Sequence, residues 1–353
     1  MSGPEHPIPP VPGGPAPRSY WSRSETDPLG PGSLVRRGWR LYRSAPGRFL
    51  LIAAVVGSLQ TILALPSLAS AADLAQRTFD VMADSFGRVV ANPEAYRYAD
   101  QQALQAELEA RLRSVLVPGT DLAALTAAGA GLGVAIGLIG TAALTAMALS
   151  IASGRPLPVA FAFRLVAARA GLVKPIVALG LGWMAVSWLS LTLQASPDVQ
   201  AWAGVAGSPR SVLIGSLLSV LALVVGIGVV VVAVRWALFI PAVLVEALGV
   251  GPGLARATQL TRGIRIRLGL AMVGIVLLQA LVIGILATVA GVAVGLSAGS
   301  FAVGFAVYMT VGLAGNMLLA PWLPAMFAVA YRDRTPPAGP PPGPAPGSGS
   351  RPV

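Results

Sequence analysis

The sequence predicts an all-α integral membrane protein whose six transmembrane helices form three hairpin-like repeats. Three observations lead to this prediction: long stretches without a charged side chain, basic residues concentrated on alternate connections, and short amphipathic segments that each precede an apolar stretch. Hydrophobic residues make up 55% of the 353 residues and charged residues only 11%, a composition unlike that of soluble domains.

The charge-free stretches give the number of spans. The longest of them, 268–331, would extend about 96 Å as one helix, whereas the hydrocarbon core of a bilayer is about 30 Å thick. We therefore expect it to fold back at Gly295-Leu-Ser-Ala-Gly-Ser300 and to form two spans. With the other four stretches, the expected spans are 49–68, 122–151, 175–195, 211–234, 268–294 and 301–330.

The distribution of charge predicts the orientation. Of the 25 Lys and Arg residues, 19 lie before the first span, after the second, in or after the fourth, or in the C-terminal tail. The segment 67–121 instead has eight acidic residues against five arginines. Because Lys and Arg on short loops stay cytoplasmic, we expect a multi-pass protein of the cell membrane with both termini inside. The net charge of +11 is then a topology signal with a secondary attraction to anionic lipid headgroups. Nucleic-acid binding is not expected, because no basic run is interleaved with aromatic residues.

Regions outside the spans fall into two kinds. Residues 1–32 and 335–353 are rich in Pro and Gly and are expected to be disordered cytoplasmic tails around a membrane domain at 33–334. The segment 70–117 has helical periodicity on both sides of Asn92-Pro93 and stops at Pro118-Gly119, which predicts an extracytoplasmic helical hairpin. A ligand-binding cap is the functional alternative for this segment.

Three basic amphipathic segments precede the outward-going spans and suggest a threefold repeat. Each is expected to lie in the headgroup plane, with its arginines toward phosphate and its aromatic residues, Trp39 and Tyr42 or Phe161 and Phe163, toward acyl chains. These segments are 33–43, 159–169 and 253–262.

The chain lacks the usual parts of an enzyme. Its sole histidine is His6, it has no cysteine, and no two carboxylates share a span. General acid–base pairing, thiolate chemistry and a metal site therefore lack their residues. We expect neither a catalytic activity nor a cofactor.

A few polar residues in or near the spans are candidates for binding. Arg235 stands at the end of the fourth expected span, where it can reach lipid phosphate, pair with Glu246, or contact a substrate or headgroup. Arg256 and Arg262, on the third amphipathic segment, are further candidates for anionic lipid. Asn316, in the sixth expected span, is predicted to make a helix–helix hydrogen bond.

Glycines recur at helical spacing in several spans. Gly129, Gly133 and Gly137 are expected to form a packing face in the second span. Similar close packing is expected in the last two spans at Gly274, Gly284, Gly291, Gly304, Gly312 and Gly315.

One stretch resembles a known family. Val234-Arg-Trp-Ala-Leu-Phe-Ile-Pro-Ala-Val-Leu-Val-Glu-Ala-Leu-Gly249, followed by Gly253-Leu-Ala-Arg-Ala-Thr-Gln-Leu-Thr-Arg-Gly263, is similar to the signature of the glycerophosphoryl diester phosphodiesterase membrane-domain family. The flanks Arg36-Arg-Gly-Trp-Arg-Leu-Tyr-Arg43 and Ala330-Tyr-Arg-Asp-Arg334 are similar to the family's flanks. Some members join this domain to a catalytic barrel. The tails here are too short for one, so the resemblance implies a stand-alone membrane domain without phosphodiesterase activity.

Two functions remain as hypotheses. The first is a non-enzymatic membrane protein that binds or organises anionic lipids, a membrane-protein partner or a second copy of itself. The second is a transporter or permease-like subunit with its site between the helical repeats. A polar cavity containing Asn316 would favour the second hypothesis, and a sealed apolar interior would disfavour it.

Overall fold

The structure, a computed structural model, describes residues 30–91, 120–195, 220, 224, 228 and 230–335, and every element in these residues is a helix. Most of the two expected tails lies outside the described residues. So do the second helix of the expected 70–117 hairpin and most of the expected span 211–234.

Five helical segments are long and apolar enough to cross a membrane, with a sixth if one bent pair counts as a span. These segments correspond to the expected spans 49–68, 122–151, 175–195, 268–294 and 301–330. The bent pair, Val230–Glu246 and Val250–Thr261, turns by 120°. The long helices are α2 (Pro46–Ala91), α5 (Thr120–Ala152), α7 (Ala170–Ala195), α12 (Arg265–Ala298), and α13 (Phe301–Leu319) leading into α14 (Trp322–Arg334).

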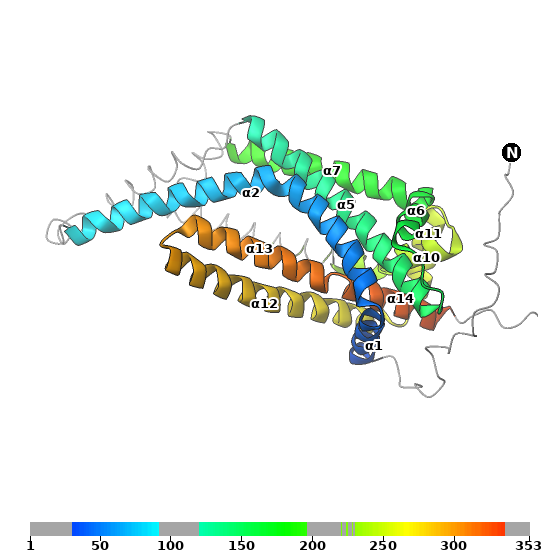
Figure 1. The fold of residues 1–353 in the computed structure, drawn as a ribbon. Coiled ribbons are helices and arrows are strands. Elements are labelled where there is room, and N and C mark those ends of the chain that lie inside the picture. Colours follow the sequence, from blue (N-terminus) through cyan, green and yellow to red (C-terminus); the bar gives the residue numbers. More distant parts are fainter. Residues whose placement is uncertain are drawn as a thin grey trace, which may run out of the picture.

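The long helices run between the same two ends of the molecule (Figure 1). Helix α5 packs against both α2 and α7, and α12 packs against α13. The two groups are connected because α13 also packs against α2. One end, which we call the basic end, carries α14 and four short helices. The other, the turn end, holds the connection from α12 to α13. The short helices are α1 (Pro31–Ser44), α6 (Val159–Ala167), α10 (Phe239–Glu246) and α11 (Val250–Thr261).

The expected fold-back of the longest uncharged stretch is confirmed. Helix α12 ends at Ala298, and Gly299 follows with φ of 62°, a left-handed conformation that glycine adopts without steric cost. The Ser300 side chain then accepts a hydrogen bond from the Val303 N–H and caps α13. One glycine and one capping serine thus turn the chain back on itself.

The expected break between the first span and the 70–117 segment is absent. Helix α2 continues through Pro66 to Ala91, so the first helix of the expected hairpin is an extension of the first span. Figure 1 shows α2 bent, with its far half projecting beyond the bundle. Proline removes one backbone hydrogen bond and kinks a helix without necessarily ending it, so a single helix can include both the expected span and the start of the expected hairpin.

The three amphipathic segments are helical, and each precedes a long apolar helix: α1 before α2, α6 before α7, and α11 before α12. All three short helices lie at the basic end (Figure 1). The element order therefore agrees with the predicted repeat of a short helix followed by a span.

The aromatic residues of α1 face protein, contrary to the prediction for Trp39 and Tyr42. The Trp39 ring lies 5.0 Å from that of Trp322 and 5.3 Å from that of Tyr42. Tyr42 is buried, and its hydroxyl donates to the Leu318 carbonyl at 3.0 Å. Burial raises the pKa of the Tyr42 phenol, so the hydroxyl remains a donor. These rings anchor α1 to the end of the last span, a contact that periodicity within α1 does not reveal.

Helix α14 is the centre of the basic end. Every residue from Pro324 to Tyr331 is buried, because α1, α5, α10 and α12 all contact this helix. Its approach to α1 is close: a Cβ on Gly38 would lie 2.9 Å from the Met326 Cα. The C-terminal helix is therefore a core element whose polar residues are held in fixed positions.

The glycine predictions are partly confirmed. In α5, a Cβ on Gly129 would lie 2.6 Å from the Leu63 carbonyl oxygen of α2, whereas one on Gly133 would meet none of the described atoms within 4 Å. In the last two spans Gly291, Gly304 and Gly315 lie in close contacts. Gly274, Gly284 and Gly312 face open space among the described residues, so periodic spacing alone overpredicted the packing face.

Candidate functional site

Glu246 is the centre of a polar cluster at the basic end. It is the last residue of α10, and its two carboxylate oxygens each accept a hydrogen bond from Arg256 Nε at 3.0 Å. The Tyr331 hydroxyl of α14 donates to Glu246 Oε1 at 2.9 Å. Three helices, α10, α11 and α14, thus meet at one carboxylate.

Local backbone geometry brings Arg256 back to Glu246. Ala247, which ends α10, has φ of 54°, a left-handed conformation that is uncommon for a residue with a Cβ. Gly249 then begins α11, which runs back at 120° to the preceding segment. This reversal is what places a side chain ten positions along the sequence against the carboxylate.

A second ion pair joins the beginning of α1 to the end of α14. Arg37 Nη1 donates to Asp333 Oδ2 at 2.9 Å, and Arg37 Nη2 donates to Asp333 Oδ1 at 2.6 Å. The side chains are 13% and 17% exposed, so solvent screens this bidentate pair less than a surface pair. It connects residues 296 positions apart in the sequence.

Two further arginines hold carbonyls of neighbouring helices. Arg332 Nη1 donates to the carbonyl of Ala152, the last residue of α5. Arg169 Nη2 donates to the Leu244 carbonyl near the end of α10 at 3.4 Å. The last carbonyls of a helix lack intrahelical donors, and a cation there also complements the helix dipole.

The structure brings together two of the predicted site residues, Arg235 and Arg262, at the surface of the basic end. Thr261 Oγ1 donates to the Arg235 carbonyl at 3.1 Å, so Arg235 lies beside the end of α11, where Arg262 follows. Both arginines are exposed. Gly263, with φ of 86°, then turns the chain into α12. The predicted alternative of an Arg235–Glu246 pair is wrong, because Arg256 and Tyr331 occupy that carboxylate.

The charge of the basic end is one-sided. Glu246 and Asp333 are the only acidic side chains among its described residues, and each is bound to an arginine. The surface around them is left cationic. Its exposed basic residues are Arg36, Arg40, Arg43, Arg48, Arg155, Arg164, Lys174, Arg235, Arg262, Arg265 and Arg267.

Asn316 lies away from this cluster, where it is exposed and lines a half-open cavity of about 330 Å³ between the helices. Helices α2, α5, α12, α13 and α14 line the cavity, and its polar side chains are Gln60, Thr141, Gln279 and Asn316. Among the described residues, the Asn316 side chain makes no hydrogen bond, so the predicted helix–helix bond is not observed there. We call this cavity the amide cavity.

Two glutamines of the amide cavity each hold a neighbouring helix. Gln60 Nε2 donates to the Gly133 carbonyl at 2.9 Å, and Gln279 Nε2 donates to the Leu319 carbonyl at 2.6 Å. Thr141 Oγ1 donates within its own helix to Gly137 at 2.9 Å. The sequence analysis did not select Gln60 or Gln279. The sequence could have identified both residues, because each is an isolated polar amide within a stretch that has no charged side chain.

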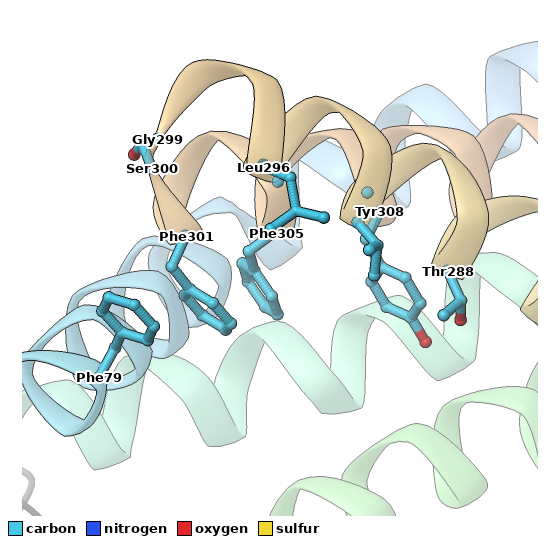
Figure 2. A pocket seen from close by; sticks show the side chains of 12 residues that line it. Phe79, Thr288, Leu296, Gly299, Ser300, Phe301, Phe305 and Tyr308 are labelled. Atoms are coloured by element: carbon cyan, nitrogen blue, oxygen red, sulfur yellow. The ribbon is translucent and has the colours of Figure 1, made fainter. Parts of the chain in front are cut away.

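A larger pocket, of about 570 Å³, lies at the turn end and is mainly apolar. Figure 2 shows Phe79 of α2 facing Phe301 and Phe305 of α13, with Tyr308 further along the same side. The Phe79 and Phe301 rings stack with centroids 5.6 Å apart. This aromatic row holds the projecting half of α2 against α13, and the pocket has no carboxylate, imidazole or cationic side chain in its lining.

The fold and these sites define a multi-helix protein with five or six helices apolar enough to span a membrane and a strongly basic end. Comparison of the chain with protein-family models, with curated proteins and with solved structures gave no match. The function must therefore be inferred from the basic end and the amide cavity.

Proposed function

We propose that the protein is a non-enzymatic integral membrane protein that binds anionic lipid headgroups through its basic end. In this proposal the protein has six spans and resides in the cell membrane, with the basic end and both termini in the cytoplasm. The glycerophosphoryl diester phosphodiesterase membrane-domain family remains its proposed family. The support for this family is that residues from two of the segments similar to it contact each other: Glu246 and Arg256 from 234–263, and Tyr331 from 330–334.

The observation that carries this proposal is the pairing of both acidic residues at the basic end. Arg256 pairs with Glu246, and Arg37 pairs with Asp333. Arg235 and Arg262 are exposed, and neither forms an ion pair with a described acid. A cationic surface on helices beside the membrane attracts phosphate-bearing lipid. The polar cluster thus has a structural role, and Arg235 and Arg262 are the proposed headgroup contacts.

We expect replacement of both Arg235 and Arg262 by glutamine to reduce binding of anionic lipid. At about 1 kcal/mol for each arginine near a charged membrane surface, the loss is roughly thirtyfold in affinity. The measurement is a titration of phosphatidylglycerol into delipidated protein, followed by native mass spectrometry. Neither side chain pairs with a described residue, so the fold should be retained.

Arg88→Gln is a control for each single replacement, because it removes one positive charge from an exposed side chain of the projecting half of α2. Its lipid binding should equal that of the wild type. Equal binding by the double variant and the wild type would count against the proposal. Arg256→Gln is a poor test, since it also breaks the Glu246 pair.

The alternative function is a transporter or permease-like subunit, and the amide cavity is the observation that favours it. Transporters commonly place a polar site near the middle of the membrane between repeats. Gln279 lies fourteen residues from Arg265, or about 21 Å along α12, and Gln60 lies about 18 Å from Arg48 along α2. In a hydrocarbon core of about 30 Å these depths are near the middle. Transport further requires passage of a bound solute to the other side.

A further inference from the structure

We propose that the amide cavity is a binding site for a small, uncharged solute rich in hydroxyl groups, of the polyol class. This inference is independent of lipid binding at the basic end. It supplies the binding step that the transporter alternative requires, but it holds equally for a protein that binds the solute without moving it.

The lining excludes a charged occupant. None of the residues that line the cavity is ionisable. An ion brought there from water would give up part of its hydration without gaining a counter-charge, which is unfavourable. A wholly apolar occupant is also unsuited, because it would offer no donor to the amide oxygens of Gln60, Gln279 and Asn316.

The hydrogen bonds of the side-chain amides show which donors and acceptors remain for an occupant of the cavity. Gln60 and Gln279 each use one N–H of Nε2 to donate to a backbone carbonyl, which leaves their Oε1 atoms as acceptors and the second N–H of each as a donor. Asn316 adds one more amide oxygen and two N–H donors. The cavity therefore offers both acceptors and donors, and a hydroxyl group, which donates and accepts, complements both.

The remaining lining and the size point to a hydroxylated carbon chain. Apolar side chains such as Val56, Leu313 and Met317 lie between the amides, and they suit C–H groups. A volume of about 330 Å³ corresponds to the liquid volume of about ten waters. A polyol of three to six carbons combines this size with several O–H donors and an apolar edge.

Gly137 maintains the space. A Cβ on Gly137 would lie 2.7 Å from Gln60 Nε2, so any larger residue would displace the amide from the cavity wall. Part of the α5 glycine pattern therefore keeps room for an amide and is not solely a helix-packing face.

Binding can be tested by saturation-transfer difference NMR on the full chain in nanodiscs, with glycerol and a six-carbon polyol as probes. Glycerol 3-phosphate serves as the charged probe. We expect signals from the neutral polyols and none above background from the phosphate in the presence of excess salt. In Asn316→Leu the polyol signal should fall at least fivefold. This substitution breaks no hydrogen bond between described residues.

Gln279→Leu should also reduce the polyol signal, and Gln259→Leu is its matched control. Gln259 is exposed on α11, outside the cavity, and the same chemical change there should leave the signal unaltered. Equal signals from wild type and both cavity variants, or a wild-type cavity that holds water only, would overturn the proposal. Uptake of the bound polyol into sealed proteoliposomes would assign transport, and binding without uptake would assign a binding role.

Discussion

Replacing Glu246 by alanine is expected to destabilise the protein by about 2–4 kcal/mol. The change removes all three hydrogen bonds to the carboxylate and leaves the Tyr331 hydroxyl, in a residue only 3% exposed, without its acceptor. A buried polar group that loses its partner costs about 1–3 kcal/mol, and hydrogen bonds to charged groups add about 1.5–3 kcal/mol. The measurement is reversible unfolding in detergent micelles followed by circular dichroism.

A comparison of Glu246→Gln with Asp84→Asn provides the control: the first variant changes the Glu246 cluster, and the second changes an exposed ion pair. Both changes turn a carboxylate into an amide, but the Asp84–Arg88 pair is half exposed and four residues apart on one helix. Such surface pairs contribute about 0.3–0.5 kcal/mol. A double-mutant cycle between Glu246→Ala and Tyr331→Phe should give a coupling above about 0.5 kcal/mol. Additive effects, or equal losses in the two amide variants, would refute a central role for the Glu246 cluster.

Leucine at position 304 is expected to separate α12 from α13. A Cβ there would lie 2.7 Å from the Gly291 carbonyl oxygen and 2.9 Å from the Gly295 Cα. Both are backbone atoms, so no rotamer change can relieve the clash and the helices must move apart. Overpacking of this kind costs about 1–3 kcal/mol or more, and the loss of helix contact adds to it. The expected result is a lower midpoint of unfolding.

Gly284→Leu is the control for Gly304→Leu. Position 284 lies in the same hairpin, but a Cβ there meets none of the described atoms within 4 Å. We expect a change within about 0.5 kcal/mol, as for substitutions away from packed sites. Comparable destabilisation by both variants would mean that the close contact of Gly304 with Gly291 and Gly295 does not hold the hairpin together.

The sequence predicted the elements that are determined by residues close together in the chain. The fold-back at 295–300 follows from span length and a glycine, and the short basic helices follow from amphipathic spacing within a dozen residues. The extension of α2 was missed because the first span and the segment 70–117 were treated as separate elements, whereas one helix continues through Pro66 and joins them.

The sites depend on contacts that local patterns do not contain. Tyr331 is 85 residues from Glu246, and Arg37 is 296 residues from Asp333. The sequence analysis placed Arg235 at the end of the fourth expected span and gave Glu246 as one of its possible partners. The turn at Ala247 gives that partner to Arg256 instead. In the amide cavity, Asn316 was selected as an isolated polar residue, whereas Gln60 and Gln279 satisfied the same criterion and were overlooked.

The proposed function places the basic end in the cytoplasm, and cysteine labelling in intact cells measures directly which side of the membrane this end faces. The chain has no cysteine, so single substitutions need no background changes. Ser153, after α5 at the basic end, and Ser297, at the turn end, are both exposed serines whose hydroxyls donate to carbonyls of their own helices. With a membrane-impermeant maleimide, Ser297→Cys should be labelled in intact cells and Ser153→Cys only after permeabilisation. Labelling of Ser153→Cys in intact cells, or of both variants alike, would contradict the cytoplasmic position of the basic end.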